Sequence, residues 1–186
     1  MDHAVFSRTL LHPRYWLLWL GLGVLWLVVQ LPYSLLLGLG RLVGKFMYYF
    51  MAERREVARI NLELCFPHMS QQEREALLRE NFASNGIALF EMAMAWWWPK
   101  RRLARLAKIE GIEHLHNAAA KGQGVVLMSL HFTTLEIGAA LLGQVVTIDG
   151  MYREHRNAAF DFVQRHGRER HNRDAWRDMA KGRWPV

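Results

Sequence analysis

The stretch that decides the fold is Val125-Val126-Leu127-Met128-Ser129-Leu130-His131-Phe132-Thr133-Thr134-Leu135-Glu136. Its first half, residues 125–130, is short, apolar and β-branched at its start, which predicts a buried strand. Residues 134–142, followed by Gly143, have the pattern of a helix with a glycine stop. His131 is therefore expected at the carboxyl end of a strand, where open α/β sheets hold their ligand sites.

His131 and Glu136 form a pair whose chemistry suits general-base catalysis. If His131 lies in the turn before the helix and Glu136 in the first helical turns, the carboxylate can hold one imidazole nitrogen. The other nitrogen can then take a proton from an attacking hydroxyl. A histidine that only caps the helix or bonds a buried carbonyl is the alternative interpretation, which the pair alone does not exclude.

A second strand and helix are predicted downstream, at residues 145–152 and 158–166. The order strand, helix, strand, helix predicts an α/β domain with a mostly parallel sheet. Arg153 follows the second predicted strand, near the same sheet edge as His131. An arginine there could steady a thioester carbonyl or a phosphate; an arginine that only faces solvent is the alternative.

The N-terminal region is uncharged from Tyr15 to Gly40, a stretch longer than the roughly 20 residues that span a bilayer. Pro32 divides it, so we expect a membrane-anchoring helix to about Leu31 followed by an interfacial segment, or a re-entrant pair. A cleaved signal peptide and a buried core helix are the alternatives. Lys and Arg are more frequent after this stretch than before it, which favours a cytoplasmic C-terminal body.

The region that follows is predicted to be helical. Residues 53–64 have apolar side chains at helical spacing, and Ser70-Gln71-Gln72-Glu73 is a capping box for a helix that closes near Pro99. Three adjacent tryptophans, 96–98, cannot all face one core. At least one is therefore expected to meet lipid or an acyl chain; packing of two against the anchor is the alternative. A basic stretch suited to an acidic partner or anionic lipid consists of Lys100, Arg101, Arg102, Arg105 and Lys108.

The composition suits a globular body with an anchor, since 52% of the residues are hydrophobic and 22% are charged. With one cysteine, Cys65, no intrachain disulfide can form. The 24 Lys and Arg against 17 Asp and Glu give a formal charge of +7, which favours an anionic membrane surface, an acidic protein or nucleic acid. Nucleic acid is not expected as a partner, because the sequence has no zinc-ligand spacing, recognition-helix pattern or RNA-binding aromatic motif.

Several stretches, in the same order along the chain, are similar to those of one family. They are Leu11 to Tyr33, Asn61 to Pro67, Ala95 to Arg102, His131 to Glu136, and Tyr152-Arg153. Together they resemble the bacterial lipid A biosynthesis acyltransferases, through about residue 172. The His-x4-Glu spacing alone is moderately specific, since glycerolipid acyltransferases share its His-x4-Asp form.

The resemblance implies an enzyme of the bacterial inner membrane, single-pass or monotopic, with its catalytic region on the cytoplasmic side and in contact with membrane lipid. It implies transfer of a fatty acyl chain, expected to be lauroyl, from acyl carrier protein to a hydroxyl of a Kdo-bearing lipid A precursor. No metal or organic cofactor is expected. His131 is carried over as the general base and Glu136 as its partner. The predicted substrate-binding residues are Arg153, Arg168 and Arg170.

The predicted organisation has four parts: an N-terminal segment with the membrane anchor (1–40), a helical membrane-proximal region (41–108), a partial α/β acyltransferase core (109–172) and a divergent tail (173–186). The resemblance implies that family members continue beyond this chain's end, so we expect an incomplete α/β domain and no activity from the short chain. A glycerophospholipid acyltransferase and a non-catalytic membrane-associated remnant are the competing functions.

Overall fold

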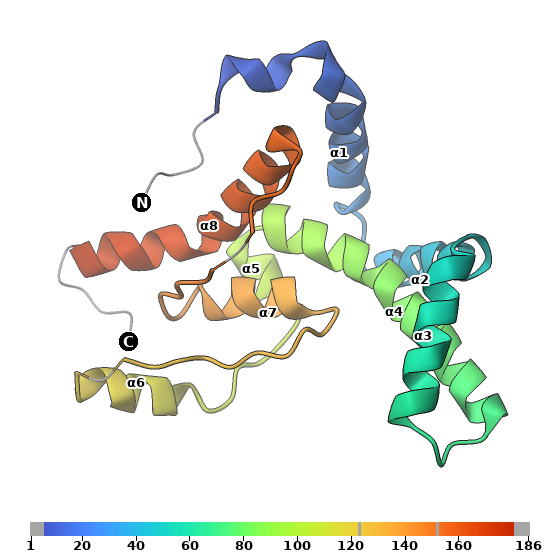
Figure 1. Ribbon diagram of the computed structural model, residues 1–186. Coiled ribbons are helices and arrows are strands. Elements are labelled where there is room, and N and C mark those ends of the chain that lie inside the picture. Colours follow the sequence, from blue (N-terminus) through green and yellow to red (C-terminus); the bar gives the residue numbers. More distant parts are fainter. Residues whose placement is uncertain (1–5, 123, 152, 181–186) are drawn as a thin grey trace. The chain divides into compact units, whose positions relative to one another are not determined.

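The structure is a computed structural model that describes residues 6–122, 124–151 and 153–180 of the chain. The regular elements of this part are helices (Figure 1). In chain order they are the short 3-10 helices η1 (Arg8–Leu11) and η2 (Pro13–Tyr15), followed by α1 (Trp16–Val28), α2 (Tyr33–Phe50), α3 (Ala52–Cys65), α4 (Gln71–Trp97), α5 (Lys100–Leu103), α6 (Ile112–Ala120), α7 (Leu135–Leu142) and α8 (Ala158–Ala180).

The predicted α/β class with a mostly parallel sheet is wrong, because the described residues contain no strand. Residues 125–130 are irregular, and the side chains of Val126 and Met128 are 96% and 95% exposed. Residues 145–146 belong to the turn after α7, residues 147–151 are irregular, and the end of this predicted strand, Tyr152, lies outside the described residues. An apolar run becomes a strand only when a neighbouring strand takes up its backbone hydrogen bonds. The described part of the chain supplies no such neighbour.

The predicted helices, in contrast, are confirmed. The capping box forms at the start of α4, where the Glu73 carboxylate accepts from the Ser70 backbone N–H at 2.8 Å and the Glu73 N–H donates to the Ser70 hydroxyl at 3.3 Å. The predicted helix over residues 53–64 is α3, and the predicted helix over residues 134–142 is α7, which ends at Gly143.

The chain folds into two compact units. One combines the described residues up to Leu20 with those from Met94 onward, and the other is the continuous segment Gly21–Ala93. The two units are described separately below.

In the unit of residues 21–93, α2 and α4 cross with their backbones in contact. A Cβ atom on Gly44 would lie 2.3 Å from the carbonyl oxygen of Phe82, and one on Gly86 would lie 2.1 Å from that of Gly40. Only glycine allows this approach. Nearby, the Tyr33 hydroxyl donates to the buried carboxylate of Glu91 at 2.8 Å. Burial, reinforced by this carboxylate, raises the pKa of Tyr33 to about 12.

The N-terminal apolar stretch does not form the single spanning helix to about Leu31 that was one of the two predicted arrangements. The apolar helix α1 has 13 residues, and the chain then turns before Pro32 and begins α2 at Tyr33. Within the described residues, no single helix is long and apolar enough to cross a membrane; the pair α2 and α3, bent by 95°, meets that length and composition only when taken together.

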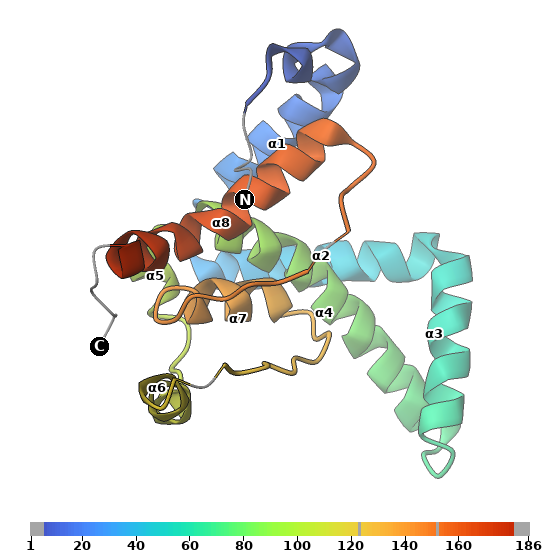
Figure 2. The same ribbon diagram turned by 60° about the vertical axis from the view of Figure 1, so that its left-hand side comes forward.

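The other unit contains α5, α6, α7 and α8. Helix α7 packs against both α8 and α5 (Figure 2). Leu10 and Tyr15 form a small core with Ala159 of α8. At the end of α4, Trp96 and Trp98 are each 1% exposed, whereas Trp97 between them is half-buried. This unit holds the predicted catalytic residues.

Candidate active site

His131 lies in an exposed, irregular segment, two residues before the turn at Thr133 and Thr134 that precedes α7. Its imidazole makes no hydrogen bond or ion pair with any described residue. The prediction that His131 precedes a helix is confirmed. The strand predicted before it is absent, because residues 125–130 are irregular. The ring is accessible to a ligand.

Glu136 is fixed much more firmly, in the first turn of α7. This short helix is anchored by Ile137, Ala140 and Leu141, which are buried. A carboxylate in the first turn interacts favourably with the unpaired N–H groups and the positive end of the helix dipole. The apolar side of α7 thus holds the backbone of Glu136 in place.

Two other elements hold the Glu136 carboxylate itself. The Arg168 guanidinium, from α8, donates through Nε to both carboxylate oxygens at 3.1 Å and through a second nitrogen to Oε1. The indole N–H of Trp96, from the end of α4, lies 3.4 Å from Oε2. A forked arginine contact fixes the plane of a carboxylate as well as its position. No hydrogen bond joins Glu136 to His131 among the described residues.

The approach of α8 to α4 depends on Gly167. A Cβ atom at this position would lie 2.6 Å from Cβ and Cγ of Trp96, so only glycine lets the tryptophan lie against the helix. The next residue, Arg168, is thereby placed within reach of Glu136. Gly167 and Trp96 set the geometry of the ion pair without being part of it.

Helix α8 also caps the end of α4. Arg170 donates to the carbonyl oxygen of Trp97 at 2.8 Å and to that of Trp96 at 3.4 Å, and the buried His171 ring lies 2.7 Å from the Ala95 carbonyl oxygen. The last carbonyls of a helix lack intrahelical partners and attract cations. These contacts therefore join the helix that carries Arg168 to the helix that carries Trp96.

The predicted site residues are thus only partly brought together. Glu136 and Arg168 are paired. Arg170 instead donates to the backbone carbonyl oxygens of Trp96 and Trp97 at the end of α4. Arg153 is exposed and irregular, and forms no hydrogen bond or ion pair with a described residue. Substrate binding by these arginines stays a prediction.

Sequence reasoning did not identify Trp96 and Gly167 as parts of the site. The signal for Gly167 was present, since a glycine inside a polar helix costs about 1 kcal/mol relative to alanine and usually has a packing reason. Its partner across the interface could not be named from the sequence. Among the described residues, no group of three or more His, Cys, Asp or Glu is arranged to hold a metal ion.

An exposed imidazole, and a carboxylate held by Arg168 and Trp96, are compatible with several kinds of chemistry. Comparison with known proteins is more specific. Residues 3–177 match the bacterial lipid A biosynthesis acyltransferases, and the chain belongs to this family.

Three relatives illustrate the similarity. The lipid A biosynthesis lauroyltransferase of Escherichia coli K12 is 49% identical over 168 residues, which cover 90% of this chain and 55% of the relative. The palmitoleoyltransferase of the same organism is 46% identical over the same shares of both chains. A lipid A biosynthesis acyltransferase of Haemophilus influenzae is 41% identical over 91% of this chain and 54% of its own length. The chain therefore spans about half the length of the curated relatives it matches. No solved structure matches it.

Proposed function

We propose that this protein transfers a fatty acyl chain, expected to be lauroyl, from acyl carrier protein to a hydroxyl of a Kdo-bearing lipid A precursor. The observation that carries the proposal is the family match over residues 3–177, a range that includes the segment from His131 to Glu136. The 49% identity to a lauroyltransferase supports the choice of acyl chain. The fixed carboxylate of Glu136 supports a general-base mechanism.

In the proposed reaction, His131 takes the proton of the acceptor hydroxyl while that oxygen bonds to the thioester carbonyl carbon. The carbonyl electrons move onto its oxygen, which Arg153 or backbone N–H groups stabilise. When the oxyanion collapses, the carbon–sulfur bond breaks and the sulfur leaves with the electron pair. The imidazolium of His131 then returns its proton to the thiolate.

Glu136 stabilises the imidazolium, and Arg168 and Trp96 position Glu136. The carboxylate keeps oxygen lone pairs beyond those used by the arginine fork. In the structure His131 and Glu136 are not bonded to each other, so the proposed pair requires residues 131–134 to bring the imidazole to the first turn of α7. The acceptor hydroxyl would then bind at the other nitrogen of the His131 ring.

We also propose monotopic attachment to the cytoplasmic side of the inner membrane, through one face of α2. Leu36, Gly40 and Gly44 of this helix are buried. On a neighbouring face Leu42, Phe46 and Phe50 are exposed, and the rings of Phe46 and Phe50 stack with centroids 4.2 Å apart. Exposed aromatic and aliphatic side chains on one helical face are typical of helices that lie in the membrane interface.

Membrane attachment is tested by sedimentation with vesicles. Replacing both Phe46 and Phe50 with serine should reduce the sedimented fraction severalfold. Replacing Val126 and Met128 with serine, which removes even more exposed apolar side chains outside α2, should not reduce it. Equal losses in the two double variants would show that α2 has no special role.

Acyl transfer is tested with lauroyl-acyl carrier protein and several acceptors. Two proteins are assayed: the 186-residue chain, and a chimera that adds the part of the E. coli lauroyltransferase not covered by the match. His131→Ala should reduce the rate of the active protein by roughly 10²–10⁴-fold, the usual contribution of a general base. His114→Ala, at an exposed histidine of α6, is the matched control and should retain activity.

The choice of acceptor separates the possible functions. Transfer to the lipid A precursor and not to glycerol phosphate supports the proposal. Transfer to glycerol phosphate alone would assign a glycerophospholipid acyltransferase. No transfer by either protein would favour a non-catalytic role.

A further inference from the structure

The segment after α4 is strongly basic. Between Met92 and Ile109 the chain has no Asp or Glu. We refer to the cations of this segment as the basic surface, which consists of Lys100, Arg101, Arg102, Arg105 and Lys108. The inference drawn below rests on the proposed function, because it concerns the protein that delivers the acyl group.

The basic surface is held on a rigid support. Leu103 of α5 is fully buried, and the Arg102 guanidinium lies over the ring of the buried Trp98, 3.5 Å from its centroid. Burial there lowers the pKa of Arg102 from its usual value. Arg102 thus anchors the segment through packing, and the more exposed cations project from it.

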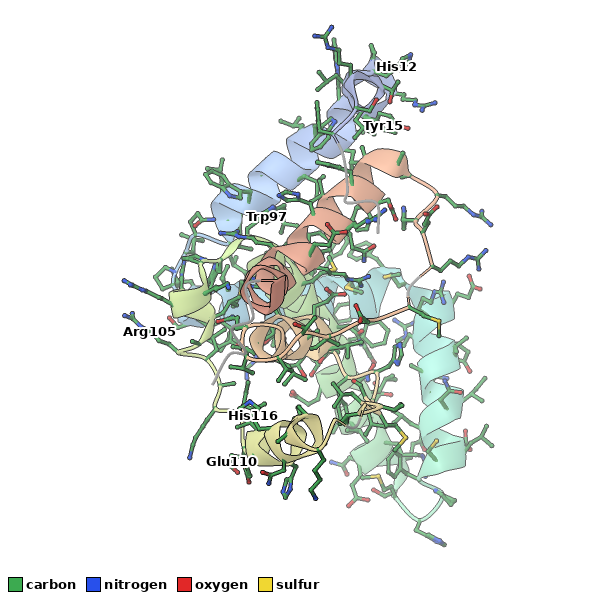
Figure 3. The ribbon with its side chains drawn as sticks, turned by 90° about the vertical axis from the view of Figure 1, so that its left-hand side faces the viewer. His12, Tyr15, Trp97, Arg105, Glu110 and His116 are labelled. Atoms are coloured by element: carbon green, nitrogen blue, oxygen red, sulfur yellow. The ribbon has the colours of Figure 1, made fainter. Side chains whose placement is uncertain are left out.

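Three cations of the basic surface face solvent. Arg101 and Arg105 are exposed and form no ion pair with a described carboxylate. Lys108 is 85% exposed, and its only described ionic neighbour is Glu110 at 3.7 Å. Figure 3 shows Arg105 on the outer side of the segment, away from α7. Arginines without carboxylate partners are available to an anionic partner at little desolvation cost.

The position of the basic surface relative to the candidate site is favourable. Helix α5 packs against α7, whose first turn carries Glu136. Trp96, the partner of Glu136, lies in the last turn of α4, and the chain continues from there through Pro99 into α5. A protein bound at α5 therefore lies next to the residues proposed to support transfer of its acyl chain.

The surface suits an acidic protein better than a membrane. A helix that binds the membrane interface combines basic residues with exposed apolar ones. The large hydrophobic residues exposed in the described structure include none between Leu89 and Val125. We propose that the basic surface is the docking site of the acidic carrier protein that presents the acyl thioester. Charge pairs at such a surface mainly accelerate association and set the orientation of the partner.

The proposal is tested by binding of lauroyl-acyl carrier protein to the full 186-residue chain, followed by fluorescence anisotropy at several salt concentrations. The test variant changes Arg101, Arg105 and Lys108 to Glu. We expect it to bind at least about 10-fold more weakly and to lose most of the salt dependence. The matched control changes Arg41, Lys45 and Arg54, at exposed positions of α2 and α3, to Glu. The control and test variants then have the same net charge, and the control variant should bind the carrier protein like the parent.

The outcomes separate this proposal from the proposed function. Equal weakening in both triple variants would show a non-specific charge effect and overturn the docking site. Absence of carrier-protein binding by the parent would overturn it as well. If the test variant instead loses binding to phosphatidylglycerol vesicles while carrier-protein binding persists, the surface binds lipid. Acyl transfer that is insensitive to the test variant, with an intact circular dichroism spectrum, would leave the acyltransferase function standing and remove only the docking site.

Discussion

Gly167→Ala is the substitution that most directly tests the packing beneath the candidate site. The added methyl group would lie 2.6 Å from two carbons of Trp96, whereas ordinary van der Waals contact begins at 3.4 Å. These carbons are Cβ and Cγ, at the base of the tryptophan, so rotating the ring does not clear them. Either α8 or the end of α4 must shift by about 0.8 Å, the difference between the two distances.

Two opposing effects set the magnitude. Overpacking in a tight interior destabilises by about 1–3 kcal/mol, while replacing a helical glycine with alanine stabilises by about 1 kcal/mol. We therefore expect Gly167→Ala to lower the free energy of unfolding by up to about 2 kcal/mol, the difference between these two effects. The control is Gly138→Ala in α7, where a new Cβ meets no atom within 4 Å; it should raise the free energy of unfolding by up to about 1 kcal/mol.

The assay is urea unfolding followed by far-ultraviolet circular dichroism, with both variants and the parent at one detergent concentration. The shift should also weaken the hydrogen bond from Trp96 to Glu136, which at 3.4 Å is already long. An active protein that carries Gly167→Ala should consequently lose activity while still folded. If Gly167→Ala were as stabilising as Gly138→Ala, α8 would not lie against Trp96 and the proposed support of Glu136 would be refuted.

Two further predictions concern the unit of residues 21–93. Gly44→Ala, whose methyl group meets the α4 backbone at Phe82, should destabilise by about 1–3 kcal/mol, whereas Gly38→Ala, with open space around it, should stabilise in the same urea titration. For Tyr33, the folded pKa of about 12 exceeds the unfolded value near 10, so its contribution to stability is complete below pH 10 and is lost as the pH rises towards 12. The stability difference between the parent and Tyr33→Phe should accordingly shrink over that interval, and a pH-independent difference would contradict the assignment.

Local signals in the sequence predicted the helices well. The capping box at Ser70 acts over three residues, and Pro32 and Pro99 stand at the N-caps of α2 and α5, in the breaks that follow α1 and α4. The periodic apolar spacing of α3 is likewise a property of neighbouring turns. None of these features depends on distant parts of the chain.

The strands and the site contacts depend on distant residues and were predicted poorly. The run at 125–130 has strand-like composition, but a strand also requires a partner at a suitable place in the fold, and composition does not provide one. Glu136 likewise has its two partners 40 and 32 residues away, at Trp96 and Arg168. The resemblance named Glu136 as a candidate, and its role stays a prediction; its neighbours became visible only in the folded chain.

The interleaving of the two units has a consequence for biosynthesis. Residues 21–93 form one continuous stretch and can collapse as soon as they leave the ribosome. Leu10 and Tyr15, however, pack against Ala159, so this early segment must wait until α8 has been made. During that delay its apolar side chains are unprotected, and closing so long a loop is slow. A chaperone or the membrane surface is therefore most needed at this stage of synthesis, before α8 has emerged.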